Sequence, residues 1–175
     1  PGTSTGSWLL TGRRTYYDLL IGKVLGQQLP SFGDMQTIMS WLPRPGQRVS
    51  LTAIRSRENT DANFDDEETS ESFAILTGAS NDLASVSFFT RAGERASSRT
   101  ILSWYRNSEQ VTVTGRFANE ARRSNSRENS NFASIGFTRD LLLRDVALRE
   151  EFSFAPSDRH GIEAGGDLHV LDTGW

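Results

Sequence analysis

Two histidines near the C-terminal end have the side chains best suited to chemistry in this sequence. His160 and His169 are the only histidines, and Glu163 and Asp167 lie between them. On an alternating strand Glu163, Asp167 and His169 share one face, and these residue types can bind a metal ion. Glu163 and His169 would, however, be about 20 Å apart at ~3.3 Å per residue. Asp167 and His169 alone are too few ligands for a closed zinc site. We therefore predict no metal site and no cofactor, and we interpret these side chains as polar lining.

A second group of candidates is the charged residues of two polar stretches. Residues 58–71 contain seven acidic residues and no basic one. They lack the Asp-x-Asp-x-Asp-Gly core of a calcium loop. Such a run is typical of a solvated loop, although it can also attract a cation or a basic partner. The stretch "RRSNSREN" is mildly basic and open to the same two interpretations. As candidate ligand contacts in outer loops we name Asp61, Asp65, Asp66, Glu67, Glu68, Arg122 and Arg123.

Motifs for catalysis are missing from the sequence. There is no phosphate-binding glycine loop, no nucleophile elbow and no metalloprotease helix motif. Serines are abundant, but a serine nucleophile needs a positioned base, and neither histidine stands in a recognisable partner motif. The net charge of −3 gives no basic footprint for nucleic acid. We predict that the chain is not an enzyme and does not bind nucleic acid.

The composition is unusual for a solid core. Hydrophobic residues make up 36% of the 175 residues, against roughly 45–50% in soluble globular domains. No run of 18 apolar residues exists, so no transmembrane helix is encoded. The N-terminus has neither an initiator methionine nor the pattern of a signal peptide. We expect residues 1–175 to be an internal piece of a longer chain.

Alternation with period two recurs along the chain, interrupted by turn residues. We predict strands over 7–17, 35–42, 48–57, 81–91, 97–117, 132–154 and 159–173, and a short helical turn near 18–26. The connections alternate in length. They are long at 18–33, 58–80 and 118–131, and short at 43–47, 92–96 and 155–159. The sequence thus predicts an all-β, antiparallel up-and-down meander of about seven long strands.

Strands of this length suit a transmembrane β-barrel. About 9–11 tilted residues span a bilayer core, and every backbone group must then pair within a closed barrel. Such a barrel is apolar outside and polar inside, which explains the low hydrophobicity. Trp41, Phe152 and Phe154 precede short turns, as in an interfacial aromatic girdle. Glu150 is an awkward charge among apolar neighbours. The side chains that we expect to face the lumen are Arg48, Arg149, Glu151, Glu163, Asp167 and His169.

Several phrases also resemble a known family. "SWLLTGRRTYYDLL", "LPSFGDMQTIMSWLPRPGQRVSL", "NDLASVSF", "TILSWYRN" and "DVALREEFSF…RHGIEAGGDLH" resemble the barrel of TonB-dependent outer-membrane receptors. The resemblance implies a 22-stranded barrel in the bacterial outer membrane, with an N-terminal plug inside it. It also implies several partners, namely outer-membrane lipid, the plug and remaining strands of the parent chain, a small-molecule ligand, and an inner-membrane energy-transducing complex that acts through the plug.

The function that the resemblance implies, and that we expect, is import of a scarce nutrient, a siderophore, cobalamin or glycan, with energy from the inner membrane. Residues 1–175 would then be a partial barrel domain, because seven strands cannot close a bacterial barrel with an even strand number. Two alternatives remain open. One is a porin-like or structural outer-membrane barrel without a plug. The other is a secreted β-sandwich that binds carbohydrate.

Overall fold

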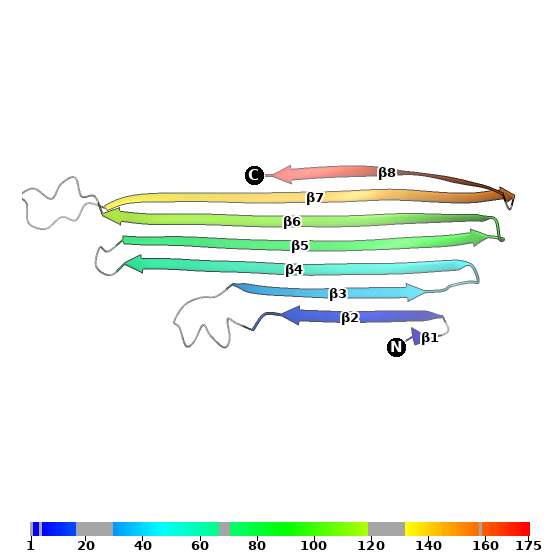
Figure 1. The fold of residues 1–175 in the computed structure, drawn as a ribbon, viewed down its shortest axis with the longest axis horizontal. Helices are drawn as coiled ribbons and strands as arrows, with labels where there is room; N and C mark the ends of the chain where they lie inside the picture. The colour runs from blue at the N-terminus through cyan, green and yellow to red at the C-terminus, as the bar shows by residue number, and fades with distance from the viewer. Residues whose placement is uncertain (1, 4, 17–29, 67–70, 119–131, 158) are drawn as a thin grey trace, which may run out of the picture.

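One antiparallel sheet accounts for all the regular structure in the described part of the chain. The computed structural model describes residues 2–3, 5–16, 30–66, 71–118, 132–157 and 159–175. The strands follow one another in chain order across the sheet (Figure 1). They are β1 (Gly2–Thr3), β2 (Gly6–Arg14), β3 (Ser31–Trp41), β4 (Gln47–Asp66), β5 (Glu71–Ala92), β6 (Ala96–Ala118), β7 (Phe132–Ser157) and β8 (His160–Gly174). The predicted all-β meander of seven long strands is confirmed, and β1 is a two-residue addition.

The predicted helical turn near 18–26 lies outside the described residues. No helix within the described ranges is long and apolar enough to cross a membrane.

Short connections gather at one end of the sheet, as predicted. Residues 42–46 join β3 to β4, residues 93–95 join β5 to β6, and residues 158–159 join β7 to β8. Gly46 and Gly93 supply positive φ angles of 78° and 64° in the first two turns, a conformation that glycine adopts without steric cost. The segment 132–154 is one strand, β7, and not two.

The predicted long loop over 58–80 is wrong. β4 and β5 continue through this segment and leave only residues 67–70 between them. Asn59 lies opposite Gly78, and the pairing continues to the ends of both strands. The rings of Phe64 and Phe73 are 6.4 Å apart between centroids. Pairing with a neighbouring strand therefore holds this polar segment extended.

One face of the sheet carries a continuous apolar belt. Side chains directly opposite one another share a face, and one such line crosses all seven long strands. We call this side the belt face and this line the central row, which consists of Trp8, Met39, Leu51, Val86, Leu102, Leu148 and Leu168. All seven side chains of the central row are exposed. On β8 the belt runs from Ile162 to Val170, roughly 26 Å of strand at ~3.3 Å per residue.

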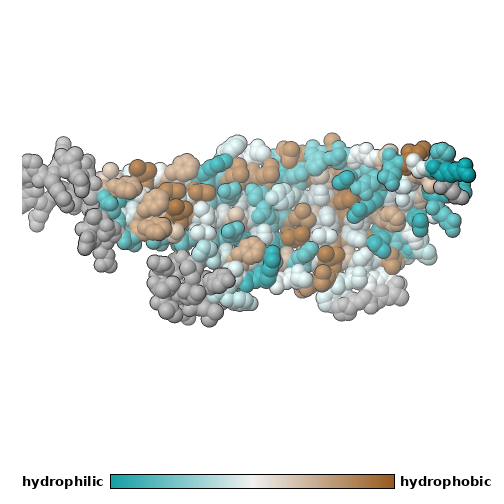
Figure 2. Space-filling model, in the orientation of Figure 1, coloured by the Kyte–Doolittle hydropathy of each residue, from teal (hydrophilic) through white to brown (hydrophobic). Residues whose placement is uncertain are grey.

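The opposite face has the reverse polarity along the strands. Near the short turns it carries mainly charged and hydroxyl side chains. Toward the long-connection end it becomes apolar, with Ala62, Phe64, Phe73, Ile75, Val113, Ile135 and Phe137 on β4–β7. Figure 2 shows apolar side chains gathered toward that end of the visible face. In this same part of the strands the belt face becomes polar. The apolar side chains therefore lie on the belt face near the short turns and on the opposite face near the long connections.

The described residues enclose almost no core. Ala147 is the only hydrophobic residue among them that is buried. The sheet is a single open layer, in which β8 pairs with β7 and no described strand pairs with its other edge. Ile162, Leu168 and Val170 are 55%, 66% and 64% exposed, whereas two packed sheets would enclose such residues.

Candidate functional site

Charged side chains from five strands meet on the opposite face near the short turns. The register places Arg48 of β4, Arg99 of β6 and Glu151 of β7 in one line, with Phe89 of β5 between the first two. A second line lies two residues closer to the turns and runs from Arg91 through Ser97 and Ser153 to Glu163. Arg149 of β7 adds a fourth arginine two residues from Glu151. We call these residues the arginine cluster, and it consists of Arg48, Arg91, Arg99, Arg149, Glu151 and Glu163.

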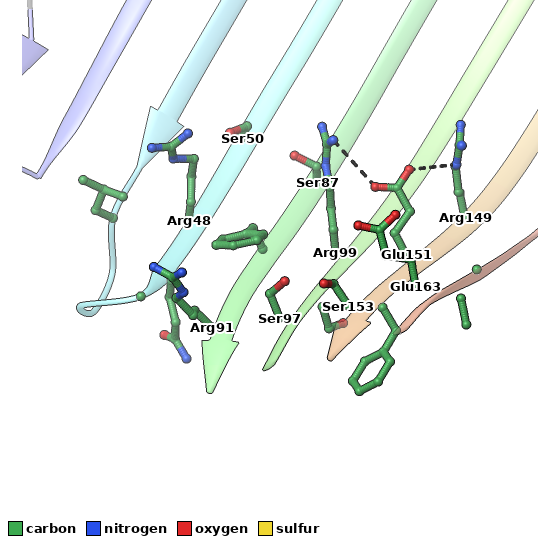
Figure 3. A pocket seen from close by; sticks show the side chains of 18 residues that line it. Arg48, Ser50, Ser87, Arg91, Ser97, Arg99, Arg149, Glu151, Ser153 and Glu163 are labelled. Atoms are coloured by element: carbon green, nitrogen blue, oxygen red, sulfur yellow. Dashed lines mark ion pairs between the residues drawn. The ribbon is translucent and has the colours of Figure 1, made fainter. Parts of the chain in front are cut away.

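Glu151 is the anionic centre of the arginine cluster. Its carboxylate lies 3.0 Å from Arg149 Nε and 3.8 Å from an Arg99 guanidinium nitrogen. Figure 3 shows Glu151 between these two arginines, with Arg48 and Arg91 on the far side of the serines. The side chains of Arg48 and Arg91 have no ion-pair partner within the described part of the chain. The four arginines outnumber the two glutamates, so the cluster is net positive.

The arginine cluster lines a broad depression of about 950 Å³, which serines and Phe89 also line. Guanidinium groups bind carboxylates and phosphates through forked hydrogen bonds. Among the described residues that line the depression there is no histidine to act as a general base for its serines, which are Ser50, Ser87, Ser97, Ser98 and Ser153. The arrangement therefore suits binding of an anionic group.

His169 of β8 lies on the same face, further from the short turns than the arginine cluster. Its Nδ1 lies 3.0 Å from the Asp145 carboxylate and its Nε2 lies 2.9 Å from Asp167. Both ring nitrogens can donate at once only when the ring is protonated. The sequence placed Asp167 beside His169 but missed Asp145, which comes from β7 and lies next to His169 only because of the strand register. The described residues contain no group of three or more ligand side chains arranged to hold a metal ion.

The residues expected to face the lumen do lie on one face. The arginine cluster contains four of them, Arg48, Arg149, Glu151 and Glu163. The other two, Asp167 and His169, lie on the same face but further from the short turns. The sequence did not single out Arg91 and Arg99. Both arginines lie near short turns, and the period-two alternation places them on the same face as the other residues of the cluster. That pattern could have identified them.

The candidates for outer-loop contacts have a different outcome. Asp61 and Asp65 lie within β4, not in a loop, and their register places them on the belt face beyond the apolar belt. The Asp61 Oδ1 atom is shielded from solvent without a hydrogen-bond partner. The Asp66 side chain, Glu67, Glu68, Arg122 and Arg123 lie outside the described residues.

Comparison with known protein families, with curated proteins and with solved structures finds no match to this chain.

Proposed function

We propose that this chain is a wall segment of a bacterial outer-membrane β-barrel receptor that imports a scarce nutrient with inner-membrane energy. The observation that carries the proposal is the central row, in which seven apolar side chains on seven adjacent strands are all exposed. Soluble monomers rarely leave such a continuous patch uncovered. Lipid chains would cover it in a membrane.

The dimensions of the belt support the same proposal. About 26 Å of strand from Ile162 to Val170, tilted by 35–45°, gives a height of about 20 Å, comparable to the ≈25 Å apolar band of outer-membrane barrels. Trp41, Phe152 and Phe154 lie on the belt face toward the short turns, and Trp104 lies at its other limit. Aromatic residues at both limits suit a pair of interfacial girdles.

The receptor part of the proposal is supported by the arginine cluster. In a barrel this cluster would face the lumen near the periplasmic rim, where a plug domain would lie. Its excess positive charge suits carboxylates on such a plug or on a ligand. The same open arginines suit a water-filled channel, which is the plug-less alternative.

The membrane part is tested with Leu102→Arg in the full natural chain. Leu102 is in the middle of the belt, and an arginine there costs about 2–4 kcal/mol when it faces the middle of a bilayer. We expect the variant to lose most of its heat-resistant, folded form in the outer-membrane fraction. Ser103→Arg, on the neighbouring residue of the opposite face, is the matched control and keeps that form. Equal behaviour of the two variants contradicts the proposal.

The transport part is tested by growth of a deletion strain on a siderophore, cobalamin or glycan as the limiting nutrient. The receptor proposal predicts that the gene restores growth only when the inner-membrane energy-transducing complex is intact. Restoration without that complex supports the porin-like alternative, and recovery of the protein in soluble secreted material supports the carbohydrate-binding one.

A further inference from the structure

Arginines occur at only one end of the belt face. Among the described strand positions, the belt and the part between the belt and the short turns carry no arginine on this face. Immediately beyond the belt, toward the long connections, a charged line crosses β4–β8. We call it the charged row, and it consists of Arg55, Asp82, Arg106, Arg144 and Asp172. Its position next to the belt places positive charge at one interface of the proposed membrane.

The two aspartates of the charged row neutralise its outer arginines. Arg55 Nε lies 3.2 Å from Asp82, and an Arg144 guanidinium nitrogen lies 3.3 Å from Asp172. Arg106 is left between them, and its Nε is shielded without a hydrogen-bond partner. The row thus contains one more cation than anions, and the excess cation is Arg106 on β6.

Arg106 and Arg144 are directly opposite each other. Like charges directly opposite each other destabilise a sheet, and a bound anion between the two guanidinium groups would relieve their repulsion. The hydroxyl of Ser108 is two residues further along the same face of β6 and adds a neutral donor. Two guanidinium forks and a hydroxyl form a donor set that matches the oxygens of a phosphate group.

We infer that Arg106 and Arg144 bind a phosphate on the headgroup of a lipid in the outer leaflet. The inference rests on the proposed function, which places the long connections outside the cell. A lipid is favoured over free phosphate because the site is continuous with the belt. On the same face, two residues closer to the short turns, Trp104 and Val146 lie next to the two arginines. Leu102 and Leu148 of the central row follow two residues further on. One lipid can therefore place its phosphate on the charged row and its acyl chains on the belt.

The test uses the full natural chain in detergent micelles, to which lipid A or enzymatically dephosphorylated lipid A is added. We expect lipid A to raise the thermal midpoint and to remain bound in native mass spectrometry, and the dephosphorylated lipid to do neither. Arg106→Gln and Arg144→Gln should each weaken lipid A binding at least tenfold. Arg139→Gln is the matched control, because Arg139 is on the opposite face of β7, across from Val111, and it should bind as the natural chain does.

The inference is overturned if both lipids bind equally, if the arginine variants keep full affinity, or if inorganic phosphate alone reproduces the shift. Failure of the proposed function looks different, because the chain would then be absent from the outer membrane and Leu102→Arg would behave like Ser103→Arg. A chain that passes those membrane tests but shows no preference for the phosphorylated lipid refutes this inference alone.

Discussion

Glu150 is the one charged side chain within the belt. It lies between Phe152 and Leu148 on β7, and its carboxylate accepts hydrogen bonds from the hydroxyls of Ser98 and Thr100 on β6. The two hydroxyls explain how the sheet accommodates a charge that is awkward by sequence alone. They solvate the carboxylate locally, but in the proposed barrel they would not remove the cost of placing it against lipid.

Glu150→Leu is therefore expected to stabilise the protein in a lipid environment. Unfolding of the full natural chain by denaturant in lipid vesicles should shift to a higher midpoint, because an apolar side chain replaces a charge in the belt. The control is Glu151→Leu on the opposite face, which leaves Arg99 and Arg149 without their acid and should not raise the midpoint. A lower midpoint for Glu150→Leu would show that this position does not face lipid.

At the scale of the strand, two adjacent glycines of β8 differ in their surroundings, and the pairing of β7 with β8 depends on one of them. A Cβ atom on Gly165 would lie 2.8 Å from the backbone oxygen of Glu150, too close for the backbone to accommodate without a shift. A Cβ atom on Gly166 would meet nothing within 4 Å. The first glycine is required by close approach of two backbones, and the second is not.

Gly165→Ala is expected to destabilise the folded protein by about 1–3 kcal/mol, since β8 must move away from β7. Gly166→Ala should change the free energy of unfolding by less than about 0.5 kcal/mol. Equilibrium unfolding of the two variants in the full natural chain measures the difference. Equal losses would mean that the strands do not approach as closely as described.

The sequence predicted the strands that carry the belt and missed the outer half of β4 and β5. Leu51, Ala53, Val86 and Phe88 alternate in step with the belt, so a short window identifies their strands. Beyond residue 58 the apolar residues change to the other face, and acidic residues occupy the belt face. Strand structure there depends on contacts across the sheet, such as Phe64 with Phe73, and a local pattern does not contain them.

For the candidate site, the sequence predicted which residues share a face but not which residues of different strands are neighbours. Alternation alone placed Arg48, Arg149, Glu151 and Glu163 on one face. Two other contacts depend on the register between strands. They are the contact of Asp145 with His169 and the position of Arg106 opposite Arg144. Register is set by turn lengths and by pairing along the whole strand, so neighbours on different strands could not be read from either strand alone.

At the scale of the whole molecule, the described sheet has a free edge along β8. An exposed edge of fifteen residues beside an apolar face is a strong template for pairing with another strand. In the proposed barrel the next strand of the parent chain occupies this edge.

Hydrogen exchange of the full natural chain tests this arrangement. We expect the β8 amides that do not bond to β7 to exchange as slowly as the amides of β6, because a following strand pairs with them. The β8 amides bonded to β7 are the internal control. Fast exchange confined to the outer amides would mean that the edge stays open in the whole protein.

In the proposed barrel, the length of β7 sets how far the protein would extend above the membrane. Its 26 residues extend roughly 85 Å, and at a tilt of 35–45° only about 25 Å of height is needed to cross the apolar band. Since the belt lies near the short turns, most of the remainder would rise past the lipid phosphates into the surface carbohydrate. The paired ends of β4–β7 would then be a rigid epitope that antibodies and bacteriophages can reach from outside an intact cell.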